Sequence, residues 1–329
     1  MAANRISFGL TLPQRAVLFG ATTIAEILRL AGEADRLPLF DSTWVGDSLL
    51  AKPRPDSIAL LGTLAAATQR VRLGVGCMAS FPVREPVTFA YQWATLDMVS
   101  GGRMLLAACT GIIPQLGLSA HEGAQWGGIA DRQRPSRLEE NIAICRRLWS
   151  EEHVHFAGKY RSFDDVTIQP RPIQQPVPIW IASNPIPEST LWERALRRVA
   201  RLADGWMTVQ ATPHFFAYNW QKLCTLLTEE GRDPRAFPNI AYHNINIGAD
   251  RQRCLEESKR FLDAYYGPIF PPPVIEAWTA AGTPEQCIAD LQELIRDGAQ
   301  RVTLRSTSWR QTEQFDRMVS EVLPFVSAG

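Results

Sequence analysis

Residues 70–111 read RVRLGVGCMASFPVREPVTFAYQWATLDMVSGGRMLLAACTG and alternate strand, helix and strand. Residues 71–76 form a short apolar run, which is typical of a parallel strand buried on both faces. Prolines within 82–86 interrupt regular structure, and 87–99 then repeats apolar residues at helical spacing. Residues 103–108 form a second strand of the buried type. Two parallel strands joined by a helix make a right-handed unit, so both strand ends open on the same side.

The same alternation continues along the whole chain. Strand candidates are 6–12, 42–45, 71–76, 104–108, 179–183, 205–209, 240–247 and 302–304. Helical patterns lie between and after them at 24–36, 57–68, 87–99, 134–149, 191–202, 215–230, 251–265 and 284–297. This series predicts one α/β domain, residues 1–329, folded as a closed parallel (β/α)8 (TIM) barrel. A doubly wound open sheet is the alternative, but the first strand lacks the glycine fingerprint of dinucleotide binding.

Two longer segments without regular periodicity interrupt the pattern. Residues 112–135 follow the fourth strand, and residues 267–282 precede the last helix. Long connections in a compact domain are usually functional. We therefore expect both insertions at the carboxyl-terminal face of the strands, as lids or pocket walls.

Composition narrows the classes of partner. The chain has 329 residues, of which 46% are hydrophobic and 21% charged, so it can bury a large core. Lys plus Arg equals Asp plus Glu, which favours a small organic substrate over nucleic acid or a membrane surface. The first residues lack a signal-peptide pattern, so we expect a cytoplasmic protein. Six cysteines without paired spacing indicate reduced thiols and no metal site.

Several short motifs carry a resemblance to a known family. They are DSTWVGD at 41–47, RVRLG at 70–74, ATLDMVSGGR at 94–103, PVPIWIAS at 176–183, RLADGW at 201–206, GTPEQC at 282–287 and VLP at 322–324. In this order and spacing, the chain resembles the bacterial-luciferase-like flavin monooxygenases. That superfamily includes relatives that use the deazaflavin coenzyme F-420, written F420 below. The resemblance covers nearly the whole chain and implies the barrel predicted above, together with a homodimer.

The resemblance assigns the end of the third strand to the cofactor. In relatives the isoalloxazine ring sits over the carboxyl ends of the strands. Behind the ring, the third strand ends in a bulge that contains a non-proline cis peptide. The corresponding bond here is Gly76-Cys77, and Ala79 follows in the same segment. Such bonds are rare and costly, and a glycine eases the crowding. An ordinary glycine-rich strand end is the alternative.

Two expected acid–base groups of the family are missing. Relatives place an Asp next to a His after the second strand, whereas this chain has Asp47 followed by Ser48. A serine hydroxyl does not titrate near neutral pH as imidazole does, so Asp47 and Ser48 remain weak catalytic candidates. Asp47 is also a candidate cofactor contact, and the alternative is an Asp that caps the next segment.

The second missing group is the Glu that some deazaflavin relatives carry after the fourth strand. In this chain the residues after that strand, 110–115, read TGIIPQ and include no acidic residue. The apolar pair predicts packing against the ring or an apolar substrate, with Gln115 as a hydrogen-bonding contact of the cofactor. This departure weakens a sugar-phosphate dehydrogenase interpretation but leaves F420 use open.

The segment after the fifth strand aligns with the loop of relatives that binds the cofactor's phosphate. Here it contains Ser183 and Asn184, and a helix predicted to begin near 188–190 would direct its amino end there. The alternative is an ordinary turn and helix cap without a ligand.

Three functions follow from the resemblance. The main hypothesis is a two-component monooxygenase, in which reduced FMN from a separate flavin reductase and O2 act on a small organic substrate. The second is an F420-dependent dehydrogenase or reductase that transfers hydride without oxygen. The third is a non-catalytic flavin-binding barrel.

Overall fold

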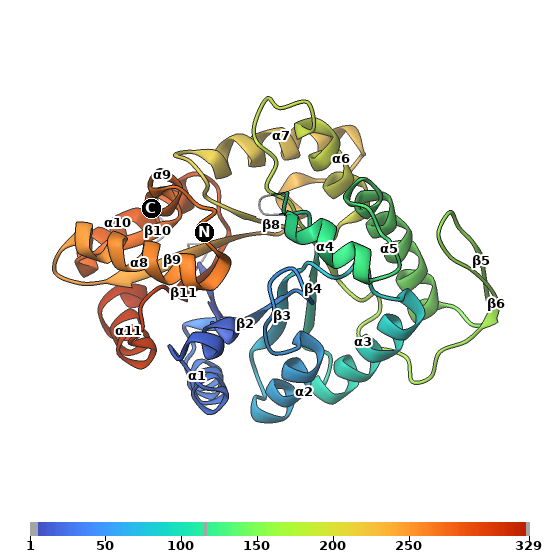
Figure 1. Cartoon of the computed structure of the whole chain (residues 1–329), viewed down its shortest axis with the longest axis horizontal. Helices are drawn as coiled ribbons and strands as arrows, with labels where there is room; N and C mark the ends of the chain where they lie inside the picture. Colours follow the sequence, from blue (N-terminus) through green and yellow to red (C-terminus); the bar gives the residue numbers. More distant parts are fainter. Residues whose placement is uncertain (1–5, 115–116, 327–329) are drawn as a thin grey trace.

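The computed structural model describes residues 6–114 and 117–326, which form a closed parallel barrel (Figure 1). Its strands are β1 (Ser7–Thr11), β2 (Phe40–Asp47), β3 (Arg72–Met78), β4 (Met104–Ala108), β7 (Ile179–Ala182), β8 (Gly205–Val209), β9 (Asn239–Ile247) and β11 (Arg301–Ser306). They pair in the order β11-β1-β2-β3-β4-β7-β8, and β9 closes the ring by pairing with both β8 and β11. The predicted (β/α)8 barrel is therefore confirmed, and the open-sheet alternative is wrong.

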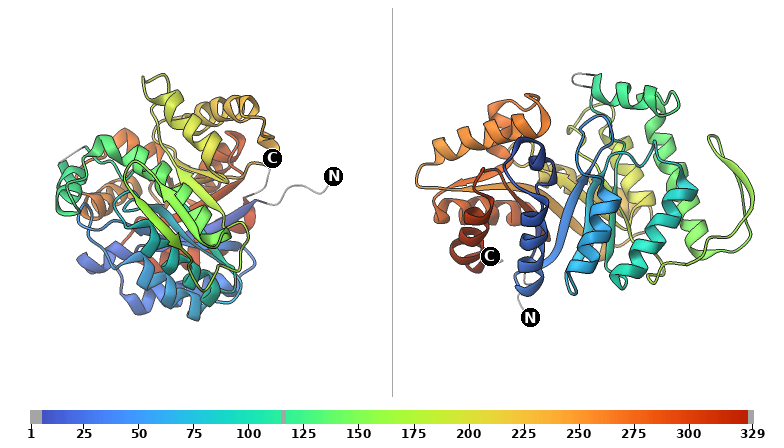
Figure 2. Two further views of the ribbon diagram at one scale, coloured as in Figure 1. Left: turned by 90° about the vertical axis from the view of Figure 1, so that its right-hand side faces the viewer. Right: turned by 60° about the horizontal axis from the view of Figure 1, so that its bottom comes forward.

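Helices surround the barrel on its outside (Figures 1 and 2). They are α1 (Ile24–Arg36), α2 (Ser57–Ala67), α3 (Pro86–Ser100), α5 (Arg134–Ser150), α6 (Trp192–Leu202), α7 (Phe215–Glu229), α8 (Arg251–Tyr266), α10 (Pro284–Arg296) and α11 (Gln311–Arg317). Capping residues set several starts, because the side chains of Thr23, Asp56 and Thr283 accept hydrogen bonds from first-turn amides. No helix in the described ranges is long and apolar enough to cross a membrane.

The hydrophobic core has two parts. The larger part lies between the strands and the surrounding helices. The smaller part lies inside the barrel and consists of Trp44, Leu105, Ala107, Trp180, Met207, Ile240, Tyr242 and Trp278. A methyl group at Gly74 would come within 2.1 Å of the Trp44 ring, so glycine is required for Trp44 to lie against β3.

Both insertions contain secondary structure that the sequence does not reveal. The first holds α4 (Leu118–Gln125) and a short 3-10 turn, η3 (Asp131–Gln133). The second holds α9 (Pro272–Ala277) and a ninth parallel strand, β10 (Thr279–Gly282). β10 pairs with the carboxyl-terminal half of β9, beyond the part that pairs with β8. A separate antiparallel hairpin, β5 (Val154–Ala157) and β6 (Ser162–Val166), projects from the barrel (Figure 2).

Candidate active site at the barrel mouth

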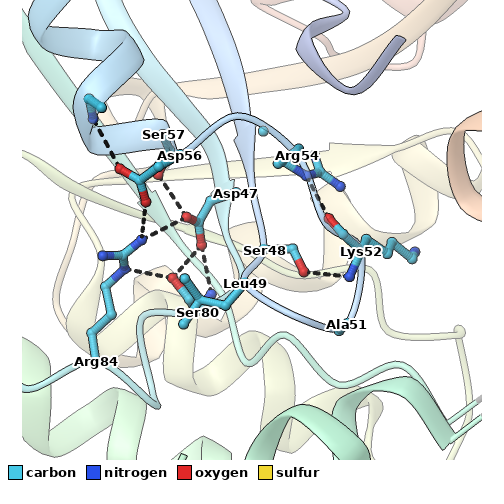
Figure 3. Close-up of polar contacts among 12 residues, drawn as sticks. Asp47, Ser48, Leu49, Ala51, Lys52, Arg54, Asp56, Ser57, Ser80 and Arg84 are labelled. Carbon is cyan, nitrogen blue, oxygen red and sulfur yellow. Dashed lines mark hydrogen bonds and ion pairs between the residues drawn. The ribbon is translucent and has the colours of Figure 1, made fainter. Parts of the chain in front are cut away.

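Asp47 ends β2 at the barrel mouth, the end where the strands finish, and its carboxylate is fully occupied (Figure 3). One oxygen accepts hydrogen bonds from the Ser57 hydroxyl at 2.7 Å and from the Arg84 guanidinium at 3.2 Å. The other oxygen accepts from both the amide, at 2.8 Å, and the hydroxyl of Ser80. The side chain is 1% exposed. These contacts join the end of β2 to α2 and to the loop after β3, which favours a positioning role.

Replacing Asp47 with asparagine is expected to destabilise the protein by about 2 kcal/mol, because hydrogen bonds to a charged partner contribute about 1.5–3 kcal/mol each. The amide nitrogen of asparagine cannot accept from the donors that now face it. Urea denaturation measures the change. Asp164→Asn is the matched control, because Asp164 is exposed in the β5–β6 hairpin, and an equal loss in both variants would contradict the prediction.

The end of β3 has the predicted backbone geometry. The Gly76-Cys77 peptide bond is cis. A methyl group on Gly76 would meet the Met207 Cε at 2.9 Å, so the small residue lets β3 lie close to a side chain from β8. Ala79 follows, and its carbonyl oxygen would lie 2.0 Å from a methyl group on Gly111. Gly111 has a φ of 63°, so the loops after β3 and β4 touch only because a glycine stands there.

Cys77 and Cys109 contact each other at the ends of β3 and β4. Their sulfur atoms are 2.6 Å apart, and both residues are free cysteines. The contact with Cys109 lowers the pKa of Cys77, burial opposes this, and the Arg54 charge lowers the pKa further. The same contact raises the pKa of Cys109. The resemblance assigns Cys77 to the cofactor region, but no motif of the sequence predicts its contact with Cys109.

The proposed phosphate loop follows β7. The Asn184 side-chain oxygen accepts a hydrogen bond from the Thr208 hydroxyl at 2.8 Å, which joins the loop to β8. Within the described part of the chain, the Ser183 hydroxyl has no hydrogen-bond partner. The following helix, α6, begins at Trp192 and not near 188–190, because Glu188 has a φ of 61°, outside the helical region. No side chain caps the amino end of α6.

Two further residues that the sequence singles out are Ser48 and Gln115. The Ser48 hydroxyl accepts a hydrogen bond from the Lys52 amide at 2.8 Å, so it closes the turn that carries Lys52 (Figure 3). Gln115 lies outside the described residues. The loop after β2 is held from α4 instead, because the Glu122 carboxylate accepts from the amides of residues 49–51 at 2.9–3.1 Å.

Four basic residues that no motif of the sequence indicates lie at the barrel mouth and are called the cationic cluster: Arg15, Lys52, Arg54 and Arg305. Arg15 lies in η1 (Gln14–Phe19) after β1, Lys52 and Arg54 lie in the loop after β2, and Arg305 lies in β11. Within the described residues, none of the four has a carboxylate within 4.0 Å, the limit for an ion pair.

Lys52 is the most informative member of the cationic cluster. It is 7% exposed, and its ammonium lies 4.5 Å from the centre of the Tyr266 ring. Burial lowers the pKa of Lys52 from 10.5 to about 8, and the Arg54 and Arg15 charges lower it as well, against the opposing effects of Tyr266 and Cys77. The Arg54 guanidinium donates to the Lys52 carbonyl at 3.1 Å and lies 5.7 Å from the Tyr265 ring.

Arg305 is fully buried among aromatic rings. Its guanidinium donates to the Asn244 side-chain oxygen at 2.8 and 3.1 Å and to the Tyr266 hydroxyl at 2.7 Å. The ring centres of Tyr265 and Tyr242 lie 4.6 and 5.2 Å away. One sequence signal could have found it, since an arginine inside the apolar strand VTLRS needs a buried polar partner or a ligand.

A closed parallel barrel with polar and reactive side chains gathered at the carboxyl ends of its strands is the arrangement of a TIM-barrel enzyme. The family model of luciferase-like monooxygenases matches residues 6–273 of the chain. The chain therefore belongs to this family of oxidoreductases, as the motifs predict.

The relatives with curated names indicate which members of this family the chain resembles. The F420-dependent glucose-6-phosphate dehydrogenase of Microbacterium testaceum is 34% identical over 253 residues, which are 73% of this chain and 69% of the relative. The enzyme of the same name from Nakamurella multipartita is 29% identical over 253 residues, 73% of this chain and 68% of the relative. Among solved structures, an F420-dependent secondary alcohol dehydrogenase in complex with an F420-acetone adduct has a TM-score of 0.80. It covers 98% of this chain and 99% of its own at 18% identity, which shows the shared fold.

Proposed function

We propose that the protein is an F420-dependent oxidoreductase that transfers hydride between the deazaflavin and a small organic substrate, without oxygen. The observation that carries the proposal is the match to relatives named as F420-dependent over about two-thirds of both chains. It favours the second hypothesis over the FMN monooxygenase. A separate flavin reductase is not required by this reaction.

The residues at the barrel mouth fit such a cofactor. Gly76, Cys77 and Ala79 form a low surface of small side chains at the end of β3. The free hydroxyl of Ser183 and the uncapped amino end of α6 supply donors for a phosphate. These two regions follow β3 and β7, which are separated only by β4, so one extended molecule can reach both.

The chain's own residues bind, orient and shield the cofactor in this mechanism. The bound deazaflavin supplies a ring carbon that accepts or donates hydride. Ser183, Asn184 and the first amides of α6 bind the phosphate. The segment with Gly76 and Cys77 supports one face of the ring, and the Asp47 contacts with Ser80 hold that segment in place. The rings of Tyr266 and Trp278 stack with their centres 6.2 Å apart, and Tyr266 also faces Lys52, so these rings would shield a bound cofactor from water.

A titration against both cofactors tests the proposal. Purified protein is titrated with F420 and with FMN, oxidised and reduced, and binding is followed by cofactor fluorescence. We expect binding of F420 at least tenfold tighter than that of FMN. Tighter binding of FMN, with oxygen uptake when reduced FMN is supplied, would overturn the proposal in favour of the monooxygenase. Binding of neither cofactor would overturn both.

Replacing Ser183 with aspartate is expected to weaken F420 binding at least tenfold, or about 1.4 kcal/mol. The new carboxylate would stand against the phosphate, whereas Ser183→Ala removes one hydrogen bond and costs about 1 kcal/mol. Fluorescence titration measures both. Ser162→Asp, in the exposed β6 strand, is the matched control, and equal affinities in the two aspartate variants would refute this location of the phosphate.

A further inference from the structure

We propose that the cationic cluster binds an anionic group of the substrate, so that the substrate is an organic carboxylate or phosphate ester. The inference rests on the proposed function and names the substrate class for the same barrel mouth. It is carried by three observations within the described residues: none of the four cations has a carboxylate partner, Lys52 and Arg305 are buried while Arg15 and Arg54 are half-buried, and all four lie at one side of the barrel mouth.

Within the described residues, the cationic cluster lacks the carboxylate partners that several other basic residues of the chain have. Lys222 and Lys259 pair with the carboxylates of Glu193 and Asp263. The Lys52 ammonium instead faces an aromatic ring, and its residue is 7% exposed. Within the described ranges, the Nη1 atom of Arg15 is buried without a hydrogen-bond partner. Both groups are donors that the protein itself leaves unsatisfied.

Burial of several like charges needs compensation. A buried charge is costly unless it is paired and hydrogen-bonded, and neighbouring cations repel each other. The rings of Tyr265 and Tyr266 face Lys52, Arg54 and Arg305 at 4.5–5.7 Å and offset part of this cost. An anion placed among the cations would complete the compensation, and charge-assisted bonds from guanidinium groups suit carboxylate and phosphate oxygens.

The location assigns the anion to the substrate and not to the cofactor's phosphate. The cationic cluster lies around β11, β1 and β2, whereas Ser183 and Asn184 follow β7 on the other side of the ring of strands. The Arg54 charge lowers the pKa of Cys77, which lies beside the proposed place of the cofactor ring, and Cys77 raises the pKa of Lys52. An anion held there lies next to the ring, where a reacting substrate must be.

The ionisation of Lys52 gives the proposal a pH dependence. The groups that face Lys52 are Tyr266 from α8, Arg54 in its own loop, Arg15 from η1 and Cys77 from β3. Because the pKa of Lys52 is about 8, the ammonium is present at pH 7 and is lost as the pH rises above that value. Anion binding should therefore weaken between pH 7 and pH 9.5. Phosphate itself gains negative charge over this range, which acts in the opposite direction.

Thermal unfolding of the apoprotein tests the site. The Tm is measured with added sodium phosphate, sodium acetate or sodium chloride at equal ionic strength, at pH 7 and pH 9.5. We expect phosphate or acetate to raise the Tm by about 2–5 °C over chloride at pH 7. The gain should fall by at least half at pH 9.5. A response to phosphate alone indicates a phosphate ester, and a response to acetate a carboxylate.

Two variants assign the effect to the cationic cluster. Lys52→Met and Arg54→Met should lose the Tm gain, and Lys159→Met should keep it, since Lys159 is exposed although it also faces a tyrosine ring, at 5.3 Å. No gain over chloride in the unmodified protein, or equal gains in all variants, would overturn the proposal.

A second titration separates this proposal from the proposed function. F420 binding is measured with and without saturating phosphate. Unchanged F420 affinity supports a substrate site. Competition that disappears in Lys52→Met, and therefore does not arise at the Ser183 loop, would overturn the proposal by giving the cationic cluster to the cofactor. If F420 does not bind at all, the proposed function fails, and the anion-dependent Tm gain still reports on the cationic cluster.

Discussion

Replacing Glu122 with leucine is expected to destabilise the fold by about 3–5 kcal/mol, the cost of removing one partner from a buried ion pair. The Glu122 carboxylate is 1% exposed and lies 3.3 Å from the Arg134 guanidinium, which is 0% exposed. Its second oxygen accepts from three consecutive amides, those of residues 49–51. Leucine would leave these amides without an acceptor. Among the described residues, the guanidinium would keep the carbonyl of Ser119 at 2.8 Å and, as its remaining carboxylate, the part-exposed Asp131 at 3.3 Å.

Urea denaturation followed by circular dichroism measures this loss. The matched control is Glu151→Leu, because Glu151 forms an exposed ion pair with Arg147 at 2.8 Å, and such surface pairs contribute about 0–1 kcal/mol. A Glu122→Leu variant as stable as the control would contradict the prediction.

The Glu122 contacts also link an insertion to the cationic cluster. α4 belongs to the segment after β4, yet through Glu122 it holds the loop after β2 that contains Lys52 and Arg54. Neither segment has a core of its own to fix its conformation. The geometry of the proposed substrate site therefore depends on the contact between α4 and the loop after β2. A change at Glu122 should disturb this site more than it disturbs the barrel strands.

The barrel could be predicted because its strands are short apolar runs between helical patterns, and each of the eight predicted strands corresponds to an observed one. β10 is missed because its sequence, TAAG, is only four residues long and resembles a loop. The predicted start of α6 is misplaced because Glu188 has a positive φ. A glycine at that position would have indicated such a backbone conformation, whereas a glutamate does not. Local pattern thus predicts the elements but not these local exceptions.

The candidate site is harder to predict from sequence. Resemblance locates the Gly76-Cys77 bond and the Ser183 loop, since each follows directly from a strand end. The cationic cluster joins residues 15, 52, 54 and 305, which meet only when the barrel closes β11 onto β1. The contact between Cys77 and Cys109 likewise depends on the register of β3 and β4. Sequence spacing carries no information about such distances.

Replacing Lys52 with methionine is expected to stabilise the apoprotein by about 3 kcal/mol at pH 7, because a pKa lowered from 10.5 to about 8 reports that much penalty on the buried charged form. Methionine keeps the length and apolar packing of the side chain but carries no charge. The sign of the effect follows because Lys52 in the unfolded chain keeps its proton up to its ordinary pKa of 10.5. The penalty on the wild type is thus complete below pH 8 and fades between pH 8 and 10.5.

The difference in unfolding free energy between Lys52→Met and the wild type should accordingly be largest at pH 7 and shrink as the pH rises toward 10. Urea denaturation at several pH values in chloride buffers measures it, with Lys159→Met as the exposed control that should change stability little at any pH. A Lys52→Met variant less stable than the wild type at pH 7 would mean that the ammonium contributes to folding. A more stable variant that no longer responds to anions would mean that the protein keeps Lys52 at a cost in stability, for the ligand it binds.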